Sequence, residues 1–249
     1  MGVFASGCGL LEEQLEDGGA TVFVFATHHA TPEDGAFPFR GDDDMPRTFE
    51  NEEGWQVTLL EAYVTISSVS LISCGGAEYP MNMFWGPCPE DLRDEDLAPL
   101  TVAGNRVDDD NYCTLRVEYA AYQTPVINDE DTDTRHETPA NANVDGTTVY
   151  LRGGARPPEG GDAVNFEVTS PSTVVVDLDL SNLEGPGRPL NVAHRENFPK
   201  ELTISKTYDR FFDETDFENF DPATLQGRLP GLLEEQTKVS PGTVVTIDD

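Results

Sequence analysis

Short runs in which apolar and polar residues alternate recur along most of this chain. The first, at residues 21–27, is β-branched and aromatic, which predicts a strand that leads directly into His28 and His29. Further alternating runs, each typical of a half-buried strand, lie at 113–119, 164–168 and 174–180. Short strands separated by turns rich in Gly and Pro predict an all-β fold, a two-sheet antiparallel β-sandwich.

The longest alternating run spans residues 55–73 and changes phase twice. Apolar residues alternate from Trp55 to Leu59, slip by one position near Glu61, and change phase again at Ser67-Ser68. A slip of one residue turns every following side chain to the other face of a strand. The run therefore predicts either a strand with β-bulges or two strands with a bend between them.

One segment near the C-terminal end predicts a helix instead. It begins at Asp221-Pro222, an N-cap residue followed by a proline at the first helical position, and it continues to about residue 236. Pro230 and Gly231 are expected to kink or split it. The aromatic residues just before it, between 208 and 220, are expected to close one end of the sandwich. We therefore expect a single domain over 20–249, with a short helical appendage near 221–236.

The chain is strongly acidic. Its 249 residues include 15 Lys and Arg against 47 Asp and Glu, a formal net charge of −32. Such a charge repels nucleic acid and anionic membrane surfaces, and we expect neither as a partner. A carboxylate-rich surface is typical of proteins that work in high salt, so a halophilic source is the first explanation.

Calcium is the second explanation for the acidic clusters. Aspartates gather at 42–44, at 108–110 and between 129 and 133, and carboxylate oxygens are the ligands that Ca²⁺ prefers. The last cluster alternates Asp129, Asp131 and Asp133 as an EF-hand loop does, but it lacks that loop's central Gly and closing Glu. A solvated acidic loop is the plainer interpretation.

The first of the four cysteines predicts export. Cys8 ends the run Ala5-Ser6-Gly7-Cys8, which resembles the cleavage site of bacterial lipoproteins, where this Cys becomes lipidated. Only four residues precede that run, so residues 1–19 predict a truncated signal remnant followed by a flexible tether, unless the resemblance is accidental. We expect an exported protein, periplasmic or extracellular, that is held by a lipid anchor to the outer or cytoplasmic membrane.

The other three cysteines bear on a disulfide bond. Cys74 ends one strand pattern and Cys113 begins another, so these two residues are the preferred pair. Cys88 is the competing partner, and the sequence leaves that alternative open. Whichever pair forms, one thiol remains.

No catalytic motif is present. The sequence lacks a nucleophile elbow, a phosphate-binding loop, a dinucleotide fingerprint and a His-Glu-x-x-His helix. We expect no enzymatic activity and assign no catalytic residue.

Histidine and methionine positions point to a transition metal. Imidazole and thioether groups suit copper, and Met81 and Met83 share a face if their loop is extended. Neighbours in a strand point to opposite faces, so His28 and His29 do not chelate one ion together unless the strand has ended. The predicted metal ligands are His28, His29, Met81, Met83, His136 and His194. Alternatively, the adjacent histidines lie in a loop while the methionines and Trp85 pack beneath it.

The order of these patterns resembles a known family. A first strand ending in His, a bent strand run at 55–71, the run Tyr112-Cys113-Thr114-Leu115, and a strand rich in Val, Leu and Asp at 174–183 are similar to periplasmic copper-associated proteins of the methanobactin-partner type. The resemblance implies an exported β-sandwich that binds copper through His28 or His29, with Trp55 or Trp85 as the nearby indole. The further His and Cys signals of that family near the C-terminus have no counterpart here.

Two functions therefore compete at the level of the sequence. The first is a lipoprotein-like β-sandwich of the cell envelope that binds a transition metal, with copper favoured. The second is a non-catalytic envelope module that recognises a protein or a glycan through loops on a rigid sandwich and has no metal role.

Overall fold

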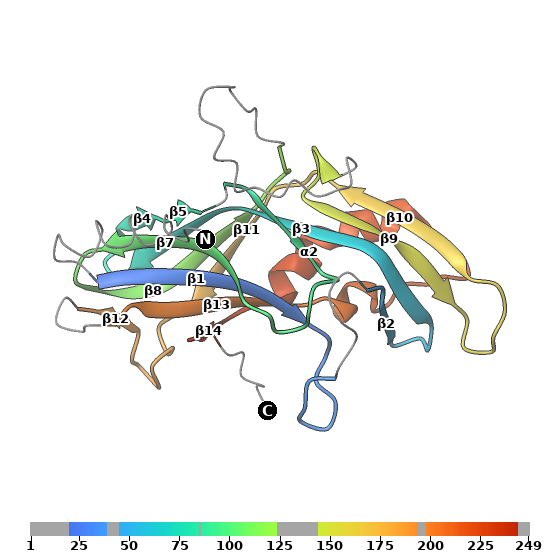
Figure 1. Cartoon of the computed structure of the whole chain (residues 1–249), viewed down its shortest axis with the longest axis horizontal. Coiled ribbons are helices and arrows are strands. Elements are labelled where there is room, and N and C mark those ends of the chain that lie inside the picture. The colour runs from blue at the N-terminus through green and yellow to red at the C-terminus, as the bar shows by residue number, and fades with distance from the viewer. Residues whose placement is uncertain (1–19, 39–44, 85, 124–143, 194–197, 244–249) are drawn as a thin grey trace, which may run out of the picture.

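The computed structural model describes residues 20–38, 45–84, 86–123, 144–193 and 198–243. Its strands form two sheets whose inner faces share one hydrophobic core (Figure 1). Val24 and Ile204 from one sheet and Val64 and Val117 from the other are fully or almost fully buried in that core. The predicted two-sheet β-sandwich is confirmed.

The smaller sheet carries the first strand. Five strands lie in it side by side, and β1 pairs with β13 in parallel while the other pairs are antiparallel. In order across the sheet they are β14 (Thr237–Pro241), β13 (Lys200–Thr207), β1 (Ala20–His29), β7 (Leu100–Val107) and β5 (Asn82–Met83).

The larger sheet is antiparallel and is organised around β3 (Gln56–Ser73). The strands on its main path are β10 (Val164–Ser170), β9 (Val149–Arg156), β3, β8 (Asp110–Tyr119) and β11 (Val174–Asp179). Short strands complete it: β12 (Leu190–Val192) on β8, and β2 (Arg47–Glu50), β4 (Glu78–Pro80) and β6 (Cys88–Asp91) on β3.

The two predicted phase changes are bulges within one strand. The register of β3 shifts between Leu59 and Glu61 against β9, and between Ile66 and Ser68 against β8. Each extra residue bends the strand and increases its twist. The strand curves along the sheet in Figure 1, and this curvature lets it pair with β2, β6 and β4 in turn. The first alternative, a bulged strand, is therefore confirmed.

Gly153 on β9 lies beside the first bulge and permits a close approach of two backbones. A Cβ atom there would lie 2.1 Å from the carbonyl oxygen of Thr58 and 2.8 Å from the Phe166 ring. We expect Gly153→Ala to lower the free energy of unfolding by about 2 kcal/mol, because the strands must separate to admit the methyl group. Gly154→Ala is the matched control, since its nearest contact is 3.4 Å away. Urea unfolding curves that coincide for the two variants would contradict this account.

The predicted helix is α2 (Pro222–Gln236). The Asp221 side chain caps it by accepting a hydrogen bond from the backbone N–H of Ala223, as the sequence indicated. The helix continues through Pro230 and Gly231, so the expected split does not occur. The carbonyl group that Pro230 leaves without its helical partner belongs to Gln226, which is exposed, and water can satisfy it.

Aromatic residues close one end of the sandwich, as predicted. The 3-10 helix η2 (Asp209–Phe212) and the segment after it place Phe212 and Phe217 against Phe166 of β10, with ring centroids 5.4 and 5.7 Å apart. Trp55 packs on Phe217 at 5.6 Å. In the part of the chain that the structure describes, no helix is both long enough and apolar enough to cross a membrane.

Candidate functional site

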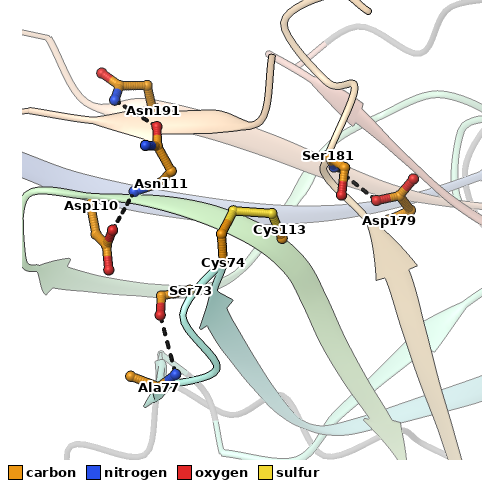
Figure 2. Close-up of a disulfide and its surroundings, with 9 residues drawn as sticks. All are labelled: Ser73, Cys74, Ala77, Asp110, Asn111, Cys113, Asp179, Ser181 and Asn191. Carbon is orange, nitrogen blue, oxygen red and sulfur yellow. Dashed lines mark hydrogen bonds between the residues drawn. A yellow bond between two sulfur atoms is a disulfide. The ribbon is translucent and has the colours of Figure 1, made fainter. Parts of the chain in front are cut away.

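A disulfide bond joins the end of β3 to β8. Cys74 and Cys113 are linked with a Cα–Cα distance of 4.8 Å (Figure 2), so the preferred pairing is confirmed. The backbone N–H of Cys74 donates to the carbonyl oxygen of Asn111, which holds the two strand ends in register. Around the bond, the Ser73 hydroxyl accepts from the N–H of Ala77, which fixes the turn after β3.

Cys88 keeps a free thiol, so the competing pairing does not form. Its side chain lies inside the sandwich on β6. Burial, with the negative charge of Glu90 nearby, raises the pKa of Cys88 to about 12. The thiol therefore stays protonated at neutral pH, and it is neither a reactive nucleophile nor a ready metal ligand.

The strand that carries the two histidines does not end before them. β1 extends through His29, so His28 and His29 point to opposite faces of the sheet. His28 has the same phase as Val22, Val24 and Ala26, and it therefore points into the core. One ion cannot be held by both rings in this arrangement.

His28 is bound through both of its ring nitrogens. Nδ1 lies 3.0 Å from Glu90 Oε1, and Nε2 lies 3.0 Å from the carbonyl oxygen of Asp94. Burial by itself would lower the pKa of His28, but the hydrogen bond and charge of Glu90, together with Asp94 and Asp96, raise it overall. Both nitrogens then donate, and the ring offers no lone pair to a metal ion in this conformation.

Lys206 lies next to His28 in the sheet and is fully buried. The parallel register places the two residues opposite each other on β1 and β13. Its Nζ lies 2.5 Å from Glu90 Oε2 and 6.0 Å from the centre of the Tyr119 ring. Glu90 thus lies between two cationic side chains. Burial alone would raise the pKa of Glu90, but Lys206 and His28 lower it overall.

A second carboxylate extends this network toward the surface. Asp96 accepts a hydrogen bond from the Tyr208 hydroxyl at 3.2 Å, and its Oδ1 lies 3.8 Å from Nε of the fully buried Arg47. Arg47 also donates to the carbonyl oxygen of Asp94. Burial raises the pKa of Asp96. We call His28, Arg47, Glu90, Asp96, Lys206 and Tyr208 the buried polar cluster.

The two histidines are expected to give opposite pH dependences of stability. The raised pKa of His28 means that its contribution is complete below pH 6.5, the ordinary value, and is lost as pH rises through the folded-state pKa. Its charged surroundings are Glu90, Asp96 and Lys206. The pKa of His29 is lowered, so its contribution is complete above 6.5 and declines below it.

We therefore expect stability to fall as pH rises above about 6.5, and His28→Asn to flatten this slope. His29→Gln should leave that slope in place and change only the behaviour at lower pH. Chemical unfolding at a series of pH values, with a chelator present, measures both slopes. A slope above pH 6.5 that is the same in the wild type and in His28→Asn would contradict the assignment.

His29 has a different environment. Its Nδ1 lies 2.8 Å from the carbonyl oxygen of Ala30 and donates to it, and its ring meets the Phe37 ring edge-on. Burial, the largest influence, lowers its pKa, so the ring is neutral at pH 7. A neutral ring that donates through Nδ1 carries its lone pair on Nε2. Metal-binding histidines are commonly oriented in this way by a hydrogen bond from the other nitrogen.

The predicted methionine ligands lie elsewhere in the sheet. Met83 pairs with Ala103, which in turn pairs with Val24 of β1. His29 is five residues further along β1, a separation of about 16 Å along the strand. Met81 is buried in the core and Met83 packs against it. The structure thus brings neither thioether to the histidines, and Trp55 packs in the aromatic end instead.

Several predicted residues lie outside the described residues. These are His136, His194, Trp85, Cys8, and the aspartates at 42–44 and 129–133. Within the ranges that are described, no group of three or more His, Cys, Asp or Glu residues is arranged to hold a metal ion. In the described aspartate cluster, Asp108 accepts a hydrogen bond from the Tyr79 hydroxyl at 3.4 Å. The metal and calcium assignments remain predictions.

The buried polar cluster was not predicted, although the sequence carries a signal for it. Lys206 has the same phase as Leu202 and Ile204, and Glu90 has the same phase as Cys88 and Leu92. A charged residue on the inward phase of a strand must find a partner across the core. Which charges meet depends on the packing of β6 against β1 and β13, and the pattern of one strand does not contain that information.

Comparisons with known proteins give one match. No protein-family model matches the chain, and no curated protein matches its sequence. Its structure is similar to that of MbnP from Methylosinus trichosporium, with a TM-score of 0.45 and 10% sequence identity, over 89% of this chain and 98% of that chain. At this TM-score and sequence identity, the match supports no conclusion about family or function. It assigns no role to any residue of this chain.

Proposed function

We propose that this protein is an exported, non-enzymatic β-sandwich of the cell envelope that binds a transition metal ion, with copper as the first candidate and His29 as one ligand. The observation that carries the proposal is the state of His29. Its ring is neutral, fixed through Nδ1 and free to offer Nε2. The copper-associated family that the sequence resembles supports copper as the first ion to test.

The disulfide supports export. Cys74 and Cys113 are bonded, and structural disulfides persist in oxidising compartments such as the periplasm and the cell exterior. Lipid anchoring at Cys8 belongs to the same proposal. The remaining metal ligands are proposed from His136 and His194, the two other histidines of the chain.

Metal analysis of protein purified without a His tag tests this function. After loading with copper(I) or copper(II) and extensive dialysis, we expect about one copper ion per chain. His29→Gln should abolish retention while leaving the unfolding curve close to that of the wild type. Met83→Leu is the matched control and should retain copper, because Met83 lies far along the sheet. Substoichiometric copper in the wild type would contradict the proposal.

A second candidate function has its own observation. Phe84 is 45% exposed and stacks on Phe23 over Gly104, which gives the outer face of the smaller sheet an aromatic patch. Exposed aromatic patches mark contacts with a protein or a glycan. Binding of the metal-free protein to isolated envelope fractions, lost in Phe84→Ser but kept in Phe198→Ser, would favour this non-metal module. Phe198 is also exposed and serves as the control.

A further inference from the structure

Lys206 and Glu90 make an unusual contact inside the sandwich. Nζ lies 2.5 Å from Oε2, and the two side chains are 0% and 3% exposed. Among the described residues, neither of these two atoms has a hydrogen-bond partner, so the amine approaches the carboxylate outside hydrogen-bond geometry. We propose that Lys206 and Glu90 condense to an intramolecular isopeptide bond between Nζ and the side-chain carboxyl carbon of Glu90.

The reaction balances without a further reagent. The ammonium group of Lys206 transfers one proton to Oε2, which leaves a neutral amine beside a neutral carboxylic acid. The nitrogen lone pair then forms a bond to the carboxyl carbon, and a second proton passes from Nζ to Oε2. The carbon–Oε2 bond breaks and one water molecule leaves. The product is a secondary amide that keeps Oε1 as its carbonyl oxygen, and no group is oxidised or reduced.

His28 is a positioning residue for this step. Its Nδ1 donates to Oε1, the oxygen that remains, and not to Oε2, the oxygen that leaves. As the carboxyl carbon becomes tetrahedral, charge develops on Oε1 at the end of this hydrogen bond. A donor fixed at the site of developing charge lowers the barrier of an acyl transfer. The carbonyl oxygen of Asp94 holds the other side of the ring.

The surroundings favour the amide over the ion pair. Two buried charges are costly to keep away from water even when they are paired, and condensation removes both. Cys88 and Tyr119 lie close enough to the pair to influence its ionisation, and both are buried neutral groups. Burial disfavours both charged forms, but the pairing outweighs it: the pKa of Lys206 is raised and that of Glu90 is lowered, so the neutral amine and acid are minor forms from which the reaction proceeds.

The fold also holds the reacting atoms together. Lys206 is fixed on β13 next to β1, and Glu90 is fixed on β6 by its pairing with Val64 of β3. A nucleophile and an electrophile held at contact distance react as though at a very high effective concentration. The bond would link the smaller sheet to the larger one, whereas the Cys74–Cys113 disulfide joins two strands of the larger sheet.

Mass spectrometry of the full-length chain tests the proposal. After reduction and denaturation, the wild type is expected to be lighter than its sequence by one water molecule. Lys206→Met should show no such loss and also calibrates any processing of the N-terminus. Lys200→Met is the matched control: Lys200 lies on the same strand and pairs with Glu184 at 3.2 Å near the surface, so this variant should keep the loss.

Peptide mapping identifies the residues from which the water molecule was lost. The expected product is a branched peptide that joins the fragments containing Glu90 and Lys206. A succinimide at an Asp-Gly sequence such as Asp145-Gly146 would give the same mass change within a linear peptide. A wild-type chain of full mass, or a loss located only in linear peptides, would overturn the proposal. Because the wild type alone decides the outcome, the test holds even if Lys206→Met folds poorly.

Discussion

Replacing Glu90 with leucine is expected to destabilise the protein by about 3–5 kcal/mol, because the change leaves buried cations without their carboxylate. Glu90 lies between Lys206 and the protonated His28, and all three side chains are nearly inaccessible to water. Leucine supplies apolar volume, but it accepts no hydrogen bond from His28 and offers no negative charge to Lys206. Thermal or urea unfolding of the variant and the wild type, each at low and at high salt concentration, measures the loss of stability.

Glu61→Leu is the matched control for this change. Glu61 forms a two-point ion pair with Arg152, at 2.9 and 2.7 Å, but Arg152 is 42% exposed and water screens the pair. Loss of such a surface pair typically costs about 1 kcal/mol or less. Equal destabilisation of the two variants would show that burial of the Glu90 site contributes nothing.

A double change separates charge compensation from loss of shape. Lys206→Met in the Glu90→Leu background removes one of the two uncompensated cations and should recover part of the lost stability. Apolar replacement of a whole buried pair is often neutral or better. If the double variant is less stable than Glu90→Leu alone, the contribution of Lys206 comes from its packing and not from its charge.

Removal of the disulfide is the second large effect that we expect. Cys74 and Cys113 are separated by 39 positions, and closing a loop of this length removes unfolded-state entropy equivalent to about 4 kcal/mol. Cys74→Ser with Cys113→Ser should therefore lower the unfolding free energy by about this amount. Unfolding curves with and without a thiol reductant provide the measurement.

Cys88→Ala gives the matched control for the disulfide. It deletes one buried sulfur atom, with an expected cost of about 1 kcal/mol, and it leaves the disulfide in place. The reductant should destabilise the wild type and Cys88→Ala but not the double serine variant. A reductant effect in the double serine variant would indicate that the stabilisation arises elsewhere.

Of the metal ligands predicted among the described residues, we retain only His29 in the proposal. His28 uses both ring nitrogens, Met83 lies along the sheet near Val24, and Met81 is buried in the core. His29 alone has a neutral ring with one nitrogen already oriented by the backbone. The copper and stability experiments therefore act on different residues of the same strand, and their outcomes are independent.

The sequence by itself predicted the fold class, a bulged or bent strand pattern at 55–73, the N-cap of α2 and Cys74–Cys113 as the preferred cysteine pair. These features depend on local patterns: alternation sets which side of a strand is buried, and a capping residue acts within one helical turn. The disulfide followed because each cysteine lies at the end of a predicted strand. Even the inward phase of His28, Glu90 and Lys206 is present in the printed sequence.

Only the tertiary structure decided what those inward-facing charges meet. His28 and Glu90 are 62 positions apart, and Lys206 comes from a strand that pairs in parallel with β1. Parallel pairing and the packing of one sheet on another depend on the whole chain, whereas alternation reports only on one strand at a time. For the same reason, the sequence predicted His28 and the methionines as ligands of a metal ion, whereas the folded chain places His28 in an ion-pair network and the thioethers elsewhere.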